Sequence, residues 1–124
     1  MAIVYIWRNA KLVNDEQVIK IRDALYTIVT KHLKMDEGEV ALRIRDIGPF
    51  DRNCSIVGIE IETGPGKGDW RKLAKDELGM DIAADIVKTG VIPEEWLGLW
   101  KSDVWLRIFS ASSFVPLGEP DQKR

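Results

Sequence analysis

The chain repeats one plan, a strand followed by a helix and a second strand, and this repetition restricts its possible folds more than any other feature. AIVYI at 2–6 matches SIVGI at 55–59, and VALRI at 40–44 matches VWLRI at 104–108. The second interval is longer because it contains the segment VIPEEWLGLW. Two such units placed side by side form one sheet with both helices on the same face, because crossover connections are right-handed.

Four segments have the residue pattern of β-strands. Residues 2–8 are rich in β-branched and aromatic residues and apolar on both faces, which is typical of a central strand. Residues 40–48 alternate between apolar and polar side chains, as a half-buried strand does. The same alternation predicts strands over CSIVGIEIETG at 54–64 and DVWLRIFSASSF at 103–114.

Two segments have helical spacing. The sequence NDEQ begins the first helix, because Asn14 can cap it and Gln17, three residues later, completes a capping box. A second helix is predicted from about Asp69 to Thr89, after the loop GPGKG, with Gly79 weakening its middle. The first helix carries an apolar stripe that requires a flat apolar surface, formed by Val18, Ile21, Leu25, Ile28 and Leu33.

These elements predict an α+β fold, in which tandem β-α-β units form a four-stranded mixed sheet with two helices on one face. We expect a single domain over residues 1–124, made of two pseudo-repeats at about 2–50 and 55–116, with a loose tail at 117–124. The other face of the sheet stays bare. Because the chain also contains five tryptophans, at positions 7, 70, 96, 100 and 105, we expect an oligomer to cover that face.

Composition excludes several kinds of partner. With 18 basic and 20 acidic residues the formal net charge is −2, and no block of five Lys or Arg occurs, which argues against nucleic-acid binding. The single cysteine, Cys54, excludes an internal disulfide and a multi-cysteine zinc site, so we expect no metal and no cofactor. No apolar run approaches the roughly 18 residues that cross a bilayer. Without a recognisable signal peptide, we expect a cytoplasmic protein with no membrane partner.

The doubled β-α-β plan, an N-terminus at the start of the first strand, the NDEQ helix start and the length of 124 residues resemble the tautomerase superfamily. The resemblance covers residues 2 to about 116. It is to the members with two β-α-β units, such as carboxymethyl-hydroxymuconate isomerase and macrophage migration inhibitory factor, which form trimers. It implies a homotrimer with an active site between subunits, around the first residue of the processed chain.

The family uses an N-terminal proline, exposed when the initiator Met is removed, as the general base or acid in keto–enol transfer. This chain has Ala2 in that place. An α-amino group has a pKa of about 7.7–8.0, and an apolar pocket lowers it, so the amine of Ala2 can act as a base near neutral pH. It is less rigid than a pyrrolidine ring, so its proton is less well aimed.

Arginines suit the rest of such a site, because guanidinium groups hold a substrate carboxylate and stabilise the developing enolate oxygen. Alternation places Arg43 and Arg45 on one strand face, and Arg107 matches them through the internal repeat. The resemblance implies catalytic roles for Ala2, Arg43 and Arg107, and substrate-binding roles for Arg45, Phe50, Trp105 and Arg8. Arg8 would replace the family's arginine before the first helix. The simpler alternative is that the strand arginines are solvated or form intersubunit ion pairs and that Trp105 packs.

Three functions remain open. The first is a tautomerase-like isomerase that acts on small 2-oxo or enol carboxylic acids through the amine of Ala2. The second is a catalytically inactive trimer with the tautomerase fold that binds a small anion or has a structural role. The third is a ferredoxin-like dimeric regulator or ligand sensor with the same order of strands and helices.

Overall fold

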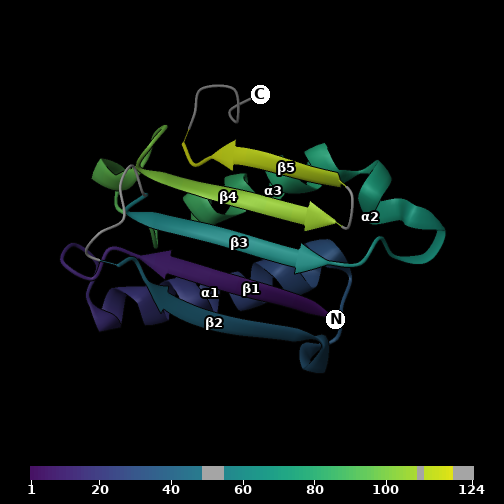
Figure 1. Ribbon diagram of the computed structural model, residues 1–124, viewed down its shortest axis with the longest axis horizontal. Coiled ribbons are helices and arrows are strands. Elements are labelled where there is room, and N and C mark those ends of the chain that lie inside the picture. The colour runs from purple at the N-terminus through teal and green to yellow at the C-terminus, as the bar shows by residue number, and fades with distance from the viewer. Residues whose placement is uncertain (49–54, 109–110, 119–124) are drawn as a thin grey trace.

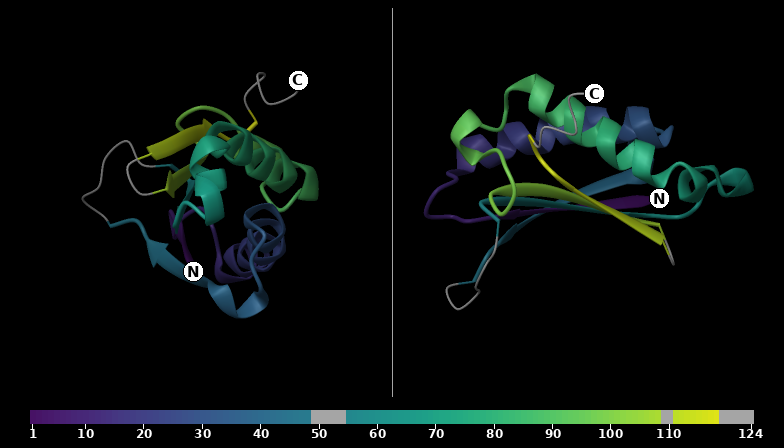
Figure 2. Two further views of the ribbon diagram at one scale, coloured as in Figure 1. Left: turned by 90° about the vertical axis from the view of Figure 1, so that its right-hand side faces the viewer. Right: turned by 90° about the horizontal axis from the view of Figure 1, so that it is seen from above.

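Five strands form one mixed sheet, and the two long helices pack across one of its faces (Figures 1 and 2). The computed structural model describes residues 1–48, 55–108 and 111–118. Phe50 and Cys54 therefore lie outside the described residues, as do residues 119–124 of the expected tail. The expected α+β fold of tandem β-α-β units is confirmed.

The sheet has the strand order β2-β1-β3-β4-β5. Each β-α-β unit contributes a parallel pair, β1 with β2 and β3 with β4, and the antiparallel pair of β1 and β3 joins the units at the centre. Strands β2 and β5 form the two edges. The strands and α-helices, in chain order, are β1 (Ala2–Arg8), α1 (Asp15–Leu33), β2 (Val40–Asp46), β3 (Val57–Thr63), α2 (Trp70–Leu73), α3 (Lys75–Thr89), β4 (Ser102–Ile108) and β5 (Ala111–Pro116).

The expected number of four strands is wrong, because the segment predicted as one strand over 103–114 folds back on itself. Its two parts, β4 and β5, pair antiparallel, with Trp105 opposite Phe114. Leu117, which the sequence places in a loose tail, is instead fully buried. Its N–H donates to the carbonyl of Ser102 at 2.8 Å, and its carbonyl accepts from the N–H of Gly98 at 2.7 Å. The core therefore extends past β5.

The predicted start of the first helix is confirmed. The Asn14 side chain accepts from the backbone N–H of Gln17 at 2.8 Å, and the Gln17 side chain accepts from the N–H of Asn14 at 2.9 Å. This reciprocal pair satisfies two of the free N–H groups at the helix N-terminus. The expected apolar stripe is buried against the sheet, and Val29 joins it.

The second predicted helix is divided. Residues 70–73 and 75–89 form α2 and α3, and Ala74 between them leaves the helical region with φ −99° and ψ 14°. Gly79 lies within α3 where the helix approaches β5 closely. A Cβ at Gly79 would lie 2.7 Å from Oγ and 3.2 Å from Cβ of Ser113, so the glycine permits this packing.

The two faces of the sheet differ in what covers them. Side chains of the inner strands that point toward the helices are buried, and Val4, Ile61 and Leu106 among them are fully buried. The opposite face, which we call the bare face, is turned toward the viewer in Figure 1. Trp105 and Phe114 on it are 41% and 50% exposed, so large apolar groups contact solvent in the single chain. No helix among the described residues is both long enough and apolar enough to span a bilayer.

Candidate functional site

The start of β1, an inner strand with a neighbour on each side, lies beside a pocket on the bare face. Ala2 is opposite Val40 of β2 and Thr63 of β3, and its side chain is fully buried. The pocket beside it has a volume of about 450 Å³, and we call it the strand-start pocket. It is lined by Met1, Ile3, Glu62, Thr63, Gly64 and Arg107.

Two polar atoms of the residues that line this pocket are buried without a partner. Within the described part of the chain, neither Oγ1 of Thr63 nor Nε of Arg107 makes a hydrogen bond. Buried polar atoms are nearly always paired with protein or water, because leaving one unpaired costs free energy. The side chain of Thr63 alternates with that of Glu62 and lies toward the helices, so the unpaired Nε of Arg107 is the one of these two atoms on the bare face, where a ligand with acceptor atoms can bind.

The guanidinium of Arg107 is held in place from two sides. Its Nη2 lies 3.1 Å from Oε2 of Glu60, and its Cζ lies 4.2 Å from the ring centroid of Trp105. Oε1 of Glu60 in turn accepts from Nε1 of Trp7 at 3.3 Å. This network fixes the position of Arg107, which lines both this pocket and a second one further along the bare face.

The structure brings some of the predicted site residues together and separates others. Arg107 lines the same pocket as Met1, next to the start of β1, and Trp105 stacks against Arg107. Arg43 and Arg45 are exposed on β2 and line neither of the two pockets. They lie opposite Tyr5 and Trp7, further along β1 than Ala2, so neither of these two pockets brings the three predicted catalytic residues together.

Arg8 lies at the other end of β1 from Ala2. Its guanidinium forms ion pairs with Asp15 at 2.7 Å and Asp46 at 2.8 Å, and it donates to the carbonyl of Val13 at 3.4 Å. The hydrogen bonds to Asp46 and Asp15 raise the pKa of Arg8 above its ordinary value. In the single chain Arg8 therefore joins β1 to β2 and to the start of α1, away from the strand-start pocket.

Sequence reasoning missed the polar residues of β3. Glu60 pairs with Arg107, and Glu62 lines the strand-start pocket, although neither glutamate was among the predicted site residues. Glu62 lies opposite Ile3 on one side and Arg107 on the other. The alternation that places Arg107 on the bare face places both glutamates there too, but only the strand order makes them neighbours. No cluster of three potential metal ligands occurs among the residues that the structure describes.

The two β-α-β units, joined through an antiparallel β1 and β3, give this chain the fold of the tautomerase superfamily. No protein-family model matches the sequence, and no curated protein is detectably similar to it. The fold is instead similar to solved structures of low sequence identity. One is N1, a member of the cis-3-chloroacrylic acid dehalogenase family, which is 15% identical with a TM-score of 0.59, over 98% of this chain and 87% of N1.

Two further solved structures have the same fold. MIF2 of Leishmania major is 19% identical, with a TM-score of 0.53 over 87% of this chain and 88% of its own. A fused 4-OT, described as a wild-type symmetric trimer, is 12% identical, with a TM-score of 0.53 over 87% and 84%. At these identities the similarity establishes the shared fold, and activity has to be argued from the site.

Proposed function

We propose that this protein is a tautomerase-like isomerase that acts on small 2-oxo or enol carboxylic acids through the amine of Ala2, after removal of Met1. The observation that carries the proposal is the shared pocket of Met1 and Arg107 at the start of β1. Met1 is 79% exposed and forms part of the pocket wall. Its removal would widen the pocket and leave the amine of Ala2 at that wall.

Two features of the pocket act on the pKa of such an amine in opposite directions. The apolar side chain of Ile3 disfavours the charged form and lowers the pKa, whereas the carboxylate of Glu62 favours the charged form and raises it. Proton transfer in both directions is efficient when the pKa of the catalytic group is close to the working pH. In enol-to-keto conversion the amine accepts the proton of the enol hydroxyl and then, as an ammonium, donates a proton to the substrate carbon, so it ends neutral as it began.

Arg107 is the anchor we propose for the substrate carboxylate. Its Nε has no partner among the described residues, and its Nη2 is held by Glu60. A charge-assisted hydrogen bond from Nε would fix the carboxylate beside the amine. Because Glu62 adds a negative charge to the same pocket, a monocarboxylate fits it better than a dicarboxylate.

The test is the ketonisation of phenylenolpyruvate by protein whose intact mass shows that Met1 is absent. We expect a rate above that of buffer, an increase on Ala2→Pro, and a loss of at least about tenfold in kcat/KM on Arg107→Gln, which corresponds to about 1.4 kcal/mol. Arg22→Gln is the control, because Arg22 pairs with Asp23 on α1, far from the pocket. A rate equal to buffer for both wild type and Ala2→Pro contradicts the proposal.

A specific observation favours the second candidate, an inactive protein that binds a small anion. Nε of Arg107 is a donor that can hold a carboxylate whether or not the amine transfers protons. Pyruvate would then raise the melting temperature of the wild type and have no effect on Arg107→Gln, while no enol substrate turns over. Turnover by the wild type rules out this alternative.

We also propose that the protein is a homotrimer. Support comes from the exposed aromatic side chains of the bare face and from the described symmetric trimer among the solved structures of this fold. Light scattering is expected to give a mass about three times that of the 14.1 kDa chain. A monomer or a dimer at micromolar concentration contradicts this assembly.

A further inference from the structure

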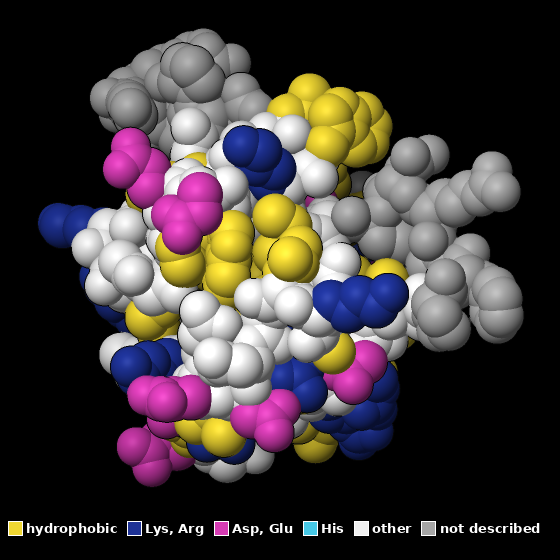
Figure 3. Space-filling model, turned by 90° about the vertical axis from the view of Figure 1, so that its left-hand side faces the viewer, with side chains coloured by type: hydrophobic (Ala, Val, Ile, Leu, Met, Phe, Trp, Pro, Cys, Tyr) yellow, Lys and Arg dark blue, Asp and Glu magenta, His cyan; other side chains and the backbone are white. Residues whose placement is uncertain are grey.

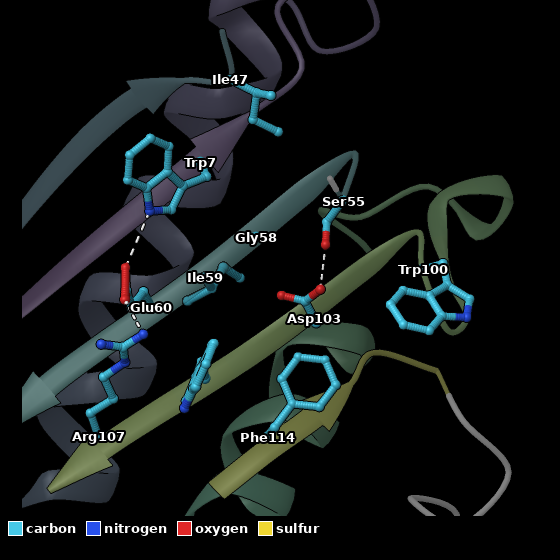
Figure 4. A pocket seen from close by; sticks show the side chains of 11 residues that line it. Trp7, Ile47, Ser55, Gly58, Ile59, Glu60, Trp100, Asp103, Arg107 and Phe114 are labelled. Atoms are coloured by element: carbon cyan, nitrogen blue, oxygen red, sulfur yellow. Dashed lines mark hydrogen bonds and ion pairs between the residues drawn. The ribbon is translucent and has the colours of Figure 1, made fainter. Parts of the chain in front are cut away.

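A second pocket, of about 420 Å³, lies on the bare face toward the other end of β1 from Met1 (Figure 4). Its floor is the row formed by Trp7, Gly58 and Asp103, which are opposite one another on β1, β3 and β4. We call it the Gly58 pocket. Its volume is in the range of small-molecule sites, about 300–1,000 Å³.

Gly58 makes this pocket hollow. A Cβ at Gly58 would lie 3.6 Å from Oδ1 of Asp103 and 3.7 Å from Cβ of Trp7, which are ordinary contact distances. The neighbouring atoms therefore do not require a glycine, although glycine inside a strand weakens it. A glycine that no packing contact demands, at the centre of a sheet, marks a position where another molecule can approach the backbone.

Aromatic side chains from different elements surround the hollow. Trp105 and Phe114 meet edge to face, with ring centroids 6.0 Å apart. Trp7 lies on the other side of Gly58 from Phe114 (Figure 4). Trp100, in the loop before β4, completes the rim and is 74% exposed. Figure 3 shows that hydrophobic side chains are exposed at this end of the molecule, among charged ones.

The backbone conformation of Trp100 indicates that this residue has a function at the pocket. Its φ of 71° lies in the left-handed region, which is costly for a bulky residue. Such conformations persist where the surrounding structure enforces them, and they cluster at ligand sites. The left-handed conformation of Trp100 places its indole at the rim of the pocket rather than in the core.

The pocket also carries a negative charge that the described residues do not neutralise. The carboxylate of Glu60 is paired with Arg107 and accepts from Trp7. Asp103 accepts a hydrogen bond from the hydroxyl of Ser55, and no basic side chain in the described part of the chain forms an ion pair with it. Burial raises the pKa of Asp103, so its charge has a cost in the empty pocket.

We propose that the Gly58 pocket binds an organic cation with a methylated ammonium group, with Asp103 as the counter-ion and the aromatic side chains around the methyl groups. A cation within about 6 Å of an aromatic ring centroid is attracted by the ring, and the attraction is larger when water is excluded. Binding would place a positive charge beside the carboxylate of Asp103.

We expect the ammonium group of the ligand to be methylated, because the pocket has few free hydrogen-bond acceptors. The carboxylate of Glu60 is already engaged by two donors, and Asp103 accepts from Ser55. A primary ammonium is strongly hydrated and brings three N–H donors that this pocket cannot all satisfy. A quaternary ammonium has no N–H donor and presents only methyl groups, which the aromatic walls accept. This proposal does not depend on the proposed isomerase activity, because it concerns a different pocket, but it requires that the proposed homotrimer leaves this part of the bare face open.

The test is a titration of the full-length protein, in the assembly it forms in solution, with choline, followed by tryptophan fluorescence and calorimetry. We expect saturable binding of choline. The neutral compound of the same shape, 3,3-dimethyl-1-butanol, is expected to bind at least tenfold more weakly, because it lacks the charge. Equal binding of the two compounds, or no binding of choline, overturns the proposal.

Two variants test the pocket by independent routes. Asp103→Asn removes the charge and keeps the shape, and Gly58→Val fills the floor with a residue that strands favour. Each is expected to weaken choline binding at least tenfold, with thermal denaturation confirming that the variant is folded. Glu77→Gln, on an exposed residue of α3, is expected to bind choline like the wild type. Unchanged binding by Asp103→Asn overturns the proposal.

The remaining possible occupant is a neighbouring copy of the chain. If a side chain of another subunit fills the hollow, the wild type does not bind choline and Asp103→Asn lowers the mass of the assembly. That pair of results overturns the cation site and assigns the pocket to a contact between chains.

Discussion

Nε2 of His32 lies 2.6 Å from Oδ2 of Asp85, so a hydrogen bond joins the two long helices that cover one face of the sheet. His32 is near the C-terminus of α1, and Asp85 is in α3. Nζ of Lys31 approaches the same carboxylate oxygen at 3.6 Å. The two β-α-β units are thus connected through their helices as well as through β1 and β3.

Acid should weaken this connection. The hydrogen bond from His32 lowers the pKa of Asp85, and the charges of His32 and Lys31 act in the same direction. A carboxyl with a lowered pKa in the folded state stabilises the fold at any pH above its unfolded value of about 3.9. That stability is lost as the pH falls through the folded value. Urea denaturation between pH 2 and pH 7 measures this dependence.

The substitution Asp85→Asn tests the same interaction by removing the charge of the carboxylate. At pH 7 we expect a loss of about 1 kcal/mol in the free energy of unfolding, a modest value because the carboxylate is partly exposed. The difference from wild type should shrink in acid. Asp81→Asn, at an exposed position of the same helix, is the control and should change stability little. A constant difference from pH 2 to pH 7 would show that the charge is not the cause.

The partly buried carboxyl of Asp103 should have the opposite effect on stability. Burial raises its pKa, so the folded state binds its proton more tightly than the unfolded chain does. The penalty is absent below the unfolded pKa of about 3.9, develops as the pH rises, and is complete above the folded pKa. Asp103→Asn should therefore raise the free energy of unfolding by about 1 kcal/mol at pH 7 without ligand. Equal gains at pH 3 and pH 7 would contradict this explanation.

Gly79→Ala should destabilise the protein even though alanine favours helices. The new methyl group would lie 2.7 Å from Oγ and 3.2 Å from Cβ of Ser113, which forces α3 away from β5. We expect a loss of about 1–3 kcal/mol in chemical denaturation, larger than the gain of about 1 kcal/mol in helix propensity. Gly38→Ala is the matched control, because no atom lies within 4 Å of a Cβ there. A Gly79→Ala protein as stable as wild type would show that β5 adjusts freely.

Arg71 is expected to stabilise the C-terminal end of α1. Its Nε and Nη2 donate to the carbonyl of Leu33 at 3.1 and 2.9 Å, and its guanidinium lies 5.1 Å from the ring of Trp70. This carbonyl is one of those that a helix C-terminus leaves free. Arg71→Gln should lower the free energy of unfolding by about 2 kcal/mol, measured by urea denaturation. Lys72→Gln, at the exposed neighbouring position, should be close to neutral, and equal losses for both variants would count against the contact with Leu33.

The sequence predicted those parts of the fold that local pattern determines. The capping pair of Asn14 and Gln17 and the burial of Val4 and Ile6 follow from residues close together in the chain. The reversal between β4 and β5 did not follow, because both strands continue the same alternation. The break at Ala74 also escaped prediction, because the residues on either side of it suit a helix.

The site was less predictable than the fold, because its contacts are between strands. Period-two alternation placed Arg107 on the bare face, but its pairing with Glu60 depends on β3 and β4 being neighbours. Arg8 shows the same limit. It pairs with Asp46, which is far away in sequence and comes close only when β1 and β2 align.

The edge position of β2 limits how copies of this chain can associate. An edge strand offers backbone donors and acceptors to another strand, and charged side chains along it restrict which strand is accepted. Two β2 strands pairing with each other would bring Arg43 and Arg45 of one copy close to the same guanidinium groups of the other. Like charges therefore disfavour the isologous dimer. They leave head-to-tail contacts, which close into rings with rotational symmetry.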